Sequence, residues 1–214
     1  MQEKNEIRNM RLSYEQDQLL ESKINKNPFA QFKSWFDLVV KNEIIEPNAM
    51  TLATATKNGI PSARVVLLKE FDELGFIFFT NYRSRKGKEI LENPNAAILF
   101  WWKEFERQIR IEGKIEKISK EESQKYFNVR PLKSRYGALA SNQSEFIANR
   151  ESLENKFTAL EKQFGENPPI PENWGGYKLI PDKFEFWQGR RDRLHDRICY
   201  EKVNGKWKIF RLQP

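Results

Sequence analysis

Cysteine and histidine are almost absent from this chain, which has one of each, Cys199 and His195, among 214 residues. A single cysteine cannot form an internal disulfide, and a zinc cluster needs more ligands of these types. A Ser-His-Asp triad would have to use His195, so metalloenzyme and hydrolase interpretations are weak and no metal is expected. Neither GxGxxG after a strand nor GxxxxGK[ST] occurs, so arginines and lysines must bind any phosphate.

Long apolar runs are also missing. The longest is the seven-residue stretch from Ala96 to Trp102, far short of the roughly 18 residues that cross a bilayer. The first ten residues are polar and charged and lack the apolar segment of a secretory signal. We therefore expect a cytoplasmic protein with no membrane partner.

Bulky core material and positive charge are abundant. The chain is 39% hydrophobic and contains 16 Phe, 6 Trp and 6 Tyr, enough for one large domain. The net charge is +7, and the segment from Lys183 to Arg211 holds nine basic and four acidic residues. An anionic partner is expected, which leaves nucleic acid, an acidic surface or a phosphorylated small molecule.

Hydrophobic periodicity predicts an α+β chain dominated by antiparallel strands. A polar arm over residues 1–26, which could be mobile, precedes a single domain over residues 27–214. An amphipathic helix begins at Asn27-Pro28, and three further helices are expected at 85–93, 120–129 and 150–164. Strands are expected at 50–56, 61–69, 75–81, 96–102, 107–118, 175–181, 183–189, 197–202 and 206–212. The simplest arrangement is a closed or nearly closed barrel with helices packed around it.

Two places along the chain could bind a phosphate. Asn81–Lys86 lies at a strand end and a helix start, where free N–H groups and the helix dipole favour an anion, although a solvated basic cap fits equally well. Arg64 and Lys69 lie at the ends of one apolar strand, on opposite faces if the strand is regular. A bulge or a barrel rim could bring both to one ligand.

A third cationic cluster lies near the C-terminus. Strand alternation would put Arg193, His195 and Arg197 on one face, and like charges in that arrangement call for an anionic partner. The alternative is a surface ladder whose charges are compensated by acidic neighbours.

The C-terminal segment resembles the signature of the pyridoxine (pyridoxamine) 5′-phosphate oxidases. The match covers Glu185, Trp187, Gln188, Arg193, Leu194, His195, Asp196 and Arg197. The motifs RVVLLK, FFTNYRSRK, ERQIRIEG, YFNVRPLKS, SNQS and WGGY follow the order of this family, so the resemblance spans residues 11–214.

This resemblance implies a split β-barrel of the FMN-binding type, with a C-terminal dimerisation region and FMN at the interface of a homodimer. Its FMN contacts would be Arg64, Val65, Val66, Leu67, Leu68, Lys69, Phe79, Thr80, Arg85, Lys86, Gln108, Gln143, Ser144, Trp187 and Arg197. Its substrate contacts would be Lys69, Tyr126, Arg130, Ser134, Arg193 and His195, with Arg11 and Tyr14 closing over the site from the N-terminal arm.

The implied reaction oxidises pyridoxine 5′-phosphate or pyridoxamine 5′-phosphate to pyridoxal 5′-phosphate, in vitamin B6 salvage. Hydride would pass from C4′ to the flavin, and O2 would reoxidise the flavin to give H2O2, with ammonia released from the amine. Of the two residues taken as catalytic, Arg193 would orient the substrate and His195 would hydrogen-bond its ring substituents. Two bound phosphates would account for the cationic excess.

Two other functions remain open from the residues alone. A nucleic-acid-binding barrel would fit the pI of about 9.4 and the aromatic residues beside basic ones, but two bound phosphates already explain the charge, so no nucleic-acid partner is expected. A flavin reductase or a cofactor-binding protein would keep the fold but change the activity. Tyr126, Arg130 and Ser134, expected on or just after one helix at a spacing of four, argue for a second phosphate site and against that alternative.

Overall fold

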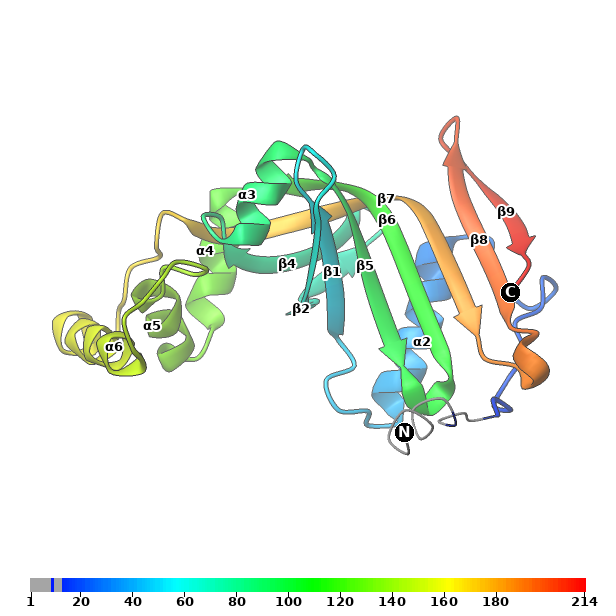
Figure 1. The fold of residues 1–214 in the computed structure, drawn as a ribbon, viewed down its shortest axis with the longest axis horizontal. Helices are drawn as coiled ribbons and strands as arrows, with labels where there is room; N and C mark the ends of the chain where they lie inside the picture. Colours follow the sequence, from blue (N-terminus) through cyan, green and yellow to red (C-terminus); the bar gives the residue numbers. More distant parts are fainter. Residues whose placement is uncertain (1–8, 10–12) are drawn as a thin grey trace. The chain divides into compact units, whose positions relative to one another are not determined.

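The computed structural model describes residue 9 and residues 13–214. Its strands follow the order β2-β1-β5-β6-β7-β4-β3, with β8 beside β7 and β9 beside β8. Figure 1 labels all of these strands except β3. The chain forms two compact units. The terminal unit contains the described residues up to Pro47 with Leu99–Ile111 and Asp182–Pro214, and the central unit contains Asn48–Ile98 and Glu112–Pro181. Strands β5 (Asn95–Trp102), β6 (Arg107–Lys117) and β7 (Trp174–Gln188) contribute residues to both.

The strands of the central unit begin with the predicted hairpin. Strands β1 (Ala49–Ala55) and β2 (Pro61–Leu67) pair antiparallel, and Gly59 in their turn has a φ of 80°, which glycine adopts without strain. The short strand β3 (Glu70–Asp72), which periodicity does not reveal, pairs with β4 (Gly75–Asn81). Strand β4 also pairs with the first half of β7.

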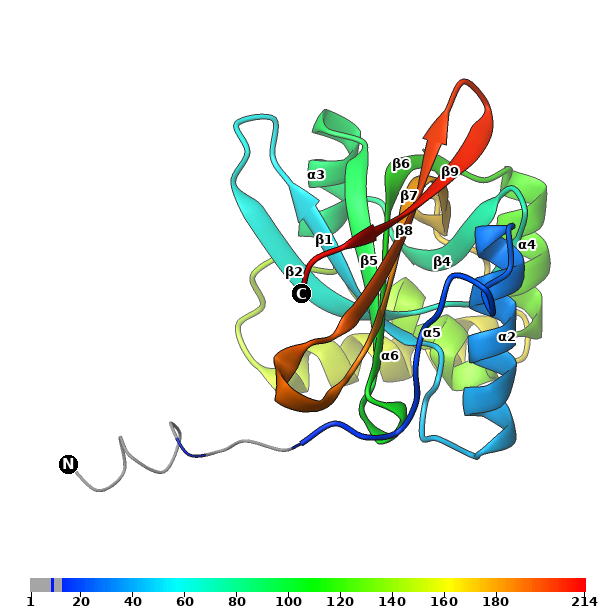
Figure 2. The ribbon, with the colours of Figure 1, turned by 90° about the vertical axis from the view of Figure 1, so that its right-hand side faces the viewer.

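The helices of the central unit start where capping residues predict. Ser84 caps α3 (Arg85–Glu92), which lies beside β1 (Figure 2), and Ser119 with Glu122 forms a capping box on α4 (Lys120–Val129). Helix α6 (Arg150–Phe164) is as expected, and it packs beside α5 (Leu132–Ala140), which the sequence does not indicate. Gly87 in α3 is needed because a Cβ there would lie 2.1 Å from the Tyr82 carbonyl oxygen.

The terminal unit is built around aromatic packing. The Asn27 side chain accepts the Phe29 N–H and caps α2 (Pro28–Lys41), as predicted. The rings of Phe32 and Trp35 on this helix lie 5.2 Å from Phe100 and 5.3 Å from Phe186. Strands β8 (Asp196–Val203) and β9 (Lys206–Leu212) form the hairpin that ends the chain (Figure 2), and the short turns η1 (Lys103–Phe105) and η2 (Arg191–Arg193) complete this unit.

Strand β7 corrects one prediction. Residues 175–181 and 183–189 were expected as separate strands, yet 174–188 is one continuous strand. It includes Pro181, which has no N–H to donate to a ladder. Pro181 falls between the last pair with β4, at Leu179, and the first pair with β8, at Lys183, so neither ladder needs its N–H. Gly113 permits the close approach there, since a Cβ on it would lie 2.1 Å from the Ile180 carbonyl oxygen.

The α+β, antiparallel fold class is confirmed. The division into an arm over residues 1–26 and one domain over 27–214 stays a prediction. Within residues 13–214, no helix is both long and apolar enough to span a membrane.

Candidate functional site

A cavity of about 650 Å³ lies in the central unit. This volume is within the range of small-molecule sites. Among the described residues, four cationic side chains and no carboxylate line the cavity. Every lining residue except Pro131 and Trp174 is among those that the sequence assigns to FMN or substrate: Arg64, Val65, Val66, Leu67, Lys69, Phe79, Thr80, Lys86, Tyr126, Arg130, Ser134, Gln143 and Ser144.

A regular strand would place Arg64 and Lys69 on opposite faces, but the chain bends at the end of β2. Strand β2 ends at Leu67, and the Lys69 N–H donates to the Ile77 carbonyl at 2.9 Å, outside the β1–β2 ladder. Strict alternation therefore does not continue to Lys69. Both cations line the same cavity, as the bulge or rim interpretation allowed.

Lys86 is a buried cation on the cavity wall. Its Nζ donates to Thr80 Oγ1 at 3.2 Å and to Gln143 Oε1 at 3.0 Å, and Gln143 also accepts from the Thr80 hydroxyl at 3.1 Å. Burial and the nearby Arg64 lower the pKa of Lys86, and Glu89 opposes this shift. A buried ammonium held by neutral oxygens is well suited to an anionic ligand.

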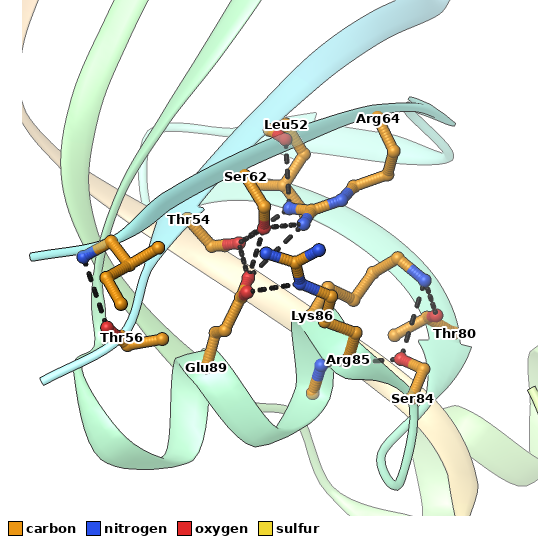
Figure 3. A network of polar contacts seen from close by, with 12 residues as sticks. Leu52, Thr54, Thr56, Ser62, Arg64, Thr80, Ser84, Arg85, Lys86 and Glu89 are labelled. Carbon is orange, nitrogen blue, oxygen red and sulfur yellow. Dashed lines mark hydrogen bonds and ion pairs between the residues drawn. The ribbon is translucent and has the colours of Figure 1, made fainter. Parts of the chain in front are cut away.

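Arg64 is held by groups of the hairpin and of α3 (Figure 3). Its guanidinium donates to the Leu52 carbonyl at 3.1 Å, to Thr54 Oγ1 at 2.6 Å, to the Ser62 hydroxyl, and to Glu89 Oε2 at 3.2 Å. Burial would raise the pKa of Glu89, but hydrogen bonds from Ser62, Thr54, Arg85 and Arg64 lower it to about 2. The carboxylate is therefore ionised and fixes the orientation of the arginine.

Aromatic rings and a second arginine form another part of the wall. Phe79 stacks on Tyr126 with centroids 4.0 Å apart and on Trp174 at 5.3 Å. The Arg130 guanidinium lies 4.9 Å from the Trp174 ring centre. Its buried NH1 finds no hydrogen-bond partner among the described residues, and burial lowers the pKa of this side chain. A buried donor without a partner indicates a missing acceptor, such as a ligand oxygen.

The three residues of the predicted second phosphate site do not share a helix. Tyr126 belongs to α4, Arg130 is the C-cap of that helix, and Ser134 lies in α5 after Pro131. The spacing of four therefore does not come from one helix face. The break at Pro131 instead turns the chain so that all three side chains line the cavity.

The terminal unit gathers Tyr14, Trp187 and His195. The Tyr14 ring centre lies 5.8 Å from that of Trp187 and 5.7 Å from that of His195, and the latter two are 4.7 Å apart. His195 Nδ1 accepts the Arg190 N–H at 3.0 Å. Burial and the charge of Arg193 lower the pKa of His195, against the opposing effect of Asp196.

The predicted alternation of Arg193, His195 and Arg197 is wrong. Strand β8 begins only at Asp196, and Arg193 ends the turn η2 with a φ of 60°. Arg197 is the one member on a strand, and its guanidinium donates to both Glu185 carboxylate oxygens, at 3.1 and 3.0 Å. This pairing matches the compensated-ladder alternative.

Three other predicted residues do not line the cavity, and a fourth, Arg11, cannot be placed against it. Leu68 is in the core at 4% exposure, and Arg85 is largely exposed and pairs with Glu89 at 2.9 Å. Gln108 is half-buried on β6 in the terminal unit, and Arg11 lies outside the described residues. Sequence reasoning missed Glu89 and Trp174, although Glu89 follows Arg85 by four residues in a predicted helix, a spacing typical of ion pairs.

Structural comparison defines the class of fold. The chain superposes on an FMN-binding, pyridoxamine 5′-phosphate oxidase-related protein of Nostoc punctiforme with a TM-score of 0.67, covering 89% of this chain and 100% of the other. The identity of 19% limits this likeness to the fold. The predicted split barrel of the FMN-binding type is confirmed.

Sequence comparison identifies the family. Residues 37–164 match the pyridoxamine 5′-phosphate oxidase model, and residues 174–214 match the pyridoxine 5′-phosphate oxidase C-terminal dimerisation region. The chain is 53% identical to the pyridoxine/pyridoxamine 5′-phosphate oxidase of Thermosynechococcus vestitus over 97% of this chain and 99% of that one. The corresponding protein of Microcystis aeruginosa is 54% identical, with 97% and 98% covered.

A solved structure of PhzG from Burkholderia lata, in complex with tetrahydrophenazine-1-carboxylic acid, is 34% identical with a TM-score of 0.88, covering 92% of this chain and 98% of that one. The chain belongs to the pyridoxine/pyridoxamine 5′-phosphate oxidase family. The prediction of an oxidoreductase of this family is thereby confirmed, and membership supports the predicted FMN cofactor.

Proposed function

We propose that this chain oxidises pyridoxine 5′-phosphate and pyridoxamine 5′-phosphate to pyridoxal 5′-phosphate, with FMN as cofactor and O2 as electron acceptor. The products would include H2O2, and ammonia from the amine, in a salvage step of vitamin B6 metabolism. FMN, when bound, supplies the hydride acceptor of this chemistry. The protein's own residues bind the two phosphorylated molecules, orient them and hold protons at defined atoms.

The observation that carries this proposal is the charge of the cavity. Arg64, Lys69, Lys86 and Arg130 contribute four positive charges, and none of the described residues that line the cavity carries a negative one. Two phosphate esters, one on the cofactor and one on the substrate, bring about four negative charges at neutral pH. The cavity therefore has the charge that two such molecules need. A surface that binds nucleic acid is not required to explain the positive charge.

The polar groups of the cavity divide into two sets. Lys86, Thr80 and Gln143 form one hydrogen-bonded set, which with Arg64 would hold the FMN phosphate. Lys69, Tyr126, Arg130 and Ser134 would hold the substrate phosphate, and the buried NH1 of Arg130, which has no partner among the described residues, supports that assignment. A flavin reductase would have no use for the second set.

The remaining site residues keep the roles that the family resemblance implies. His195 Nδ1 accepts a backbone N–H, so the neutral imidazole carries its proton on Nε2 and can donate a hydrogen bond from there. Arg193 would orient the substrate. Gln108, Trp187 and Arg197 would contact FMN, and Tyr14 with Arg11 would cover the substrate.

We also propose that the active unit is a homodimer with FMN at the interface. The match of residues 174–214 to a C-terminal dimerisation region supports this assembly. Sedimentation of the FMN-loaded protein should give twice the mass of the chain. A fully active, FMN-loaded monomer would contradict the proposal.

The function is tested with purified protein, FMN and each vitamer under air. We expect oxygen-dependent formation of pyridoxal 5′-phosphate and H2O2 in equal amounts. Pyridoxine and pyridoxamine without phosphate serve as matched controls and should react far more slowly. Since the PhzG structure contains a tricyclic carboxylic acid, a phosphate-free substrate of that kind is a second comparison. Preference for it over both vitamers would overturn the proposal.

A further inference from the structure

One buried carboxylate, Glu89, lies among the cations of the proposed FMN phosphate site. Its side chain is 5% exposed. Oε1 accepts from Arg85 Nε at 2.9 Å, and Oε2 accepts from Arg64 at 3.2 Å (Figure 3). Glu89 therefore joins an arginine of the strand β2 to an arginine of the helix α3.

The β1–β2 hairpin contributes two hydroxyls to the same oxygen. Thr54 and Ser62 are direct partners in the ladder, and each donates to Glu89 Oε2 at 2.5 Å. Both hydroxyls also accept from Arg64. Its Nη1 donates to Thr54 and to the Leu52 carbonyl, and its Nη2 donates to Ser62. The guanidinium is thus held at both terminal nitrogens, which removes the rotamer freedom that a long side chain would otherwise lose on binding a ligand.

Charge balance agrees with this geometry. Arg64, Arg85 and Lys86 give +3, and Glu89 gives −1, so the set carries +2. A phosphate monoester carries nearly two negative charges at neutral pH. Without the carboxylate, the repulsion between Arg64 and the buried Lys86 would not be compensated.

From this geometry we infer that Glu89 is a positioning residue: it holds Arg64 and Arg85 in the orientation that selects a flavin bearing a 5′-phosphate. The inference rests on the proposed use of FMN and adds a specificity determinant to it. It also predicts whether phosphate binding becomes stronger or weaker when Glu89 is removed. If Glu89 acted only through its charge, its removal would strengthen the binding of a phosphate, because like charges repel. If it positions the arginines, its removal weakens that binding.

The test compares Glu89→Gln with Glu92→Gln. Both variants remove one negative charge from α3, but Glu92 is exposed. Dissociation constants for FMN and for riboflavin are measured by quenching of flavin fluorescence. We expect Glu89→Gln to weaken FMN about 10- to 100-fold, the effect of a lost charge-assisted contact, and to change riboflavin by less than about threefold. Glu92→Gln should change neither.

Three outcomes overturn the inference or its basis. Unchanged or tighter FMN binding by Glu89→Gln refutes the positioning role, and equal weakening of FMN and riboflavin shows a general structural role. A wild-type protein that binds neither flavin refutes the proposed function itself.

If Glu89→Gln does not fold, Ser62→Ala decides instead, because it removes one hydroxyl from both Glu89 and Arg64. It should lower the preference for FMN over riboflavin about threefold or more, the effect of one neutral hydrogen bond, and an unchanged preference refutes the inference.

Discussion

The basic side chains of the two units have different partners. In the central unit, four cations and, within the described part of the chain, no carboxylate line the cavity, and Glu89, which does not line it, pairs with Arg64. In the terminal unit, the arginines are matched by acids: Arg107 with Asp17, Arg110 and Arg197 with Glu185, Arg190 with Asp196, Arg191 with Glu15, and Arg211 with Glu21 and Asp196. Net charge along a segment therefore does not locate a ligand, whereas a cavity lined by several cations does.

Arg193 differs from the other arginines of its segment. Among the described residues it forms no ion pair, although Arg191 and Arg197 on either side of it do. An arginine without an acidic partner is available to a ligand, which agrees with its proposed role toward the substrate. Among the described residues, the comparison thus distinguishes arginines that have an acidic partner, such as Arg197, from arginines that have none, such as Arg193 and Arg130, and each kind can be tested.

The largest effect is expected for Glu185→Gln, in the terminal unit. Glu185 is 3% exposed and accepts from Arg110 and Arg197, so the variant removes the carboxylate that two partly buried guanidiniums share. Removing one partner of a buried pair costs about 3 kcal/mol. We expect a loss of this order in the free energy of unfolding, measured by urea denaturation. The control Glu201→Gln alters an exposed acid on β8, and equal stability of both variants would remove the distinction between the two units.

Arg130→Met tests an arginine that is assigned to ligand binding. The guanidinium has a buried NH1 without a partner among the described residues, and methionine keeps much of its packing against Trp174. The free energy of unfolding should stay within about 0.5 kcal/mol of wild type. At saturating FMN, kcat/KM for the phosphorylated vitamers should fall about 10- to 100-fold, as expected for a lost contact to a charged ligand. A variant as unstable as Glu185→Gln would show that Arg130 serves the fold.

Two lysine substitutions separate the arginines on either side of His195. Arg193→Lys keeps the charge but loses the planar fork, so we expect kcat/KM to fall about tenfold with FMN affinity nearly intact. Arg197→Lys should weaken FMN instead, and because it also loses the bidentate pair with the largely buried Glu185, it should cost about 1 kcal/mol of stability. If Arg193→Lys released the flavin and turned over normally at saturating FMN, these assignments would be reversed.

Local signals predicted most of the fold. The Asn27 and Ser84 caps, the Ser119–Glu122 capping box and the β1–β2 hairpin depend on neighbouring residues, so short-range chemistry reveals them. Helix α5 and the continuity of β7 through Pro181 depend on contacts far along the chain, which periodicity does not report. Of the cavity residues, Arg64, Lys69 and Lys86 were indicated by their positions at strand ends and at a helix start, whereas others, such as Phe79 and Gln143, were identified only through the family resemblance.

The predicted strand register of the C-terminal arginines was wrong because of backbone angles that the residue types do not indicate. Asp192 and Arg193 both have positive φ, 55° and 60°, which only a small share of residues other than glycine adopt. The chain therefore turns where alternation was assumed, and β8 starts three residues after Arg193. Alternation is reliable only inside a strand whose start is known.

The smallest effect concerns the protonation of His195. Burial and the charge of Arg193 lower its pKa below the usual 6.5, and Asp196 opposes them. Since His195 is the only histidine, the untagged protein gives one imidazole titration curve by proton NMR. Its midpoint should lie below 6.5. Arg193→Met should raise the midpoint and Asp196→Asn should lower it further, while Arg191→Met, which removes a cation already paired with Glu15, serves as the control.

The same shift sets the sign of a pH effect on stability. A folded-state pKa below the unfolded value means that the folded imidazole stays neutral at pH values where the unfolded chain has already bound a proton. The contribution of His195 to stability is therefore complete above pH 6.5 and is lost as the pH falls from there through the folded-state pKa. Protonation would also replace the Nδ1 lone pair that accepts the Arg190 N–H. A midpoint above 6.5, or one that Arg193→Met leaves unchanged, would show that the charge of Arg193 does not act on the imidazole. Arg193 would then not differ electrostatically from its ion-paired neighbours Arg191 and Arg197.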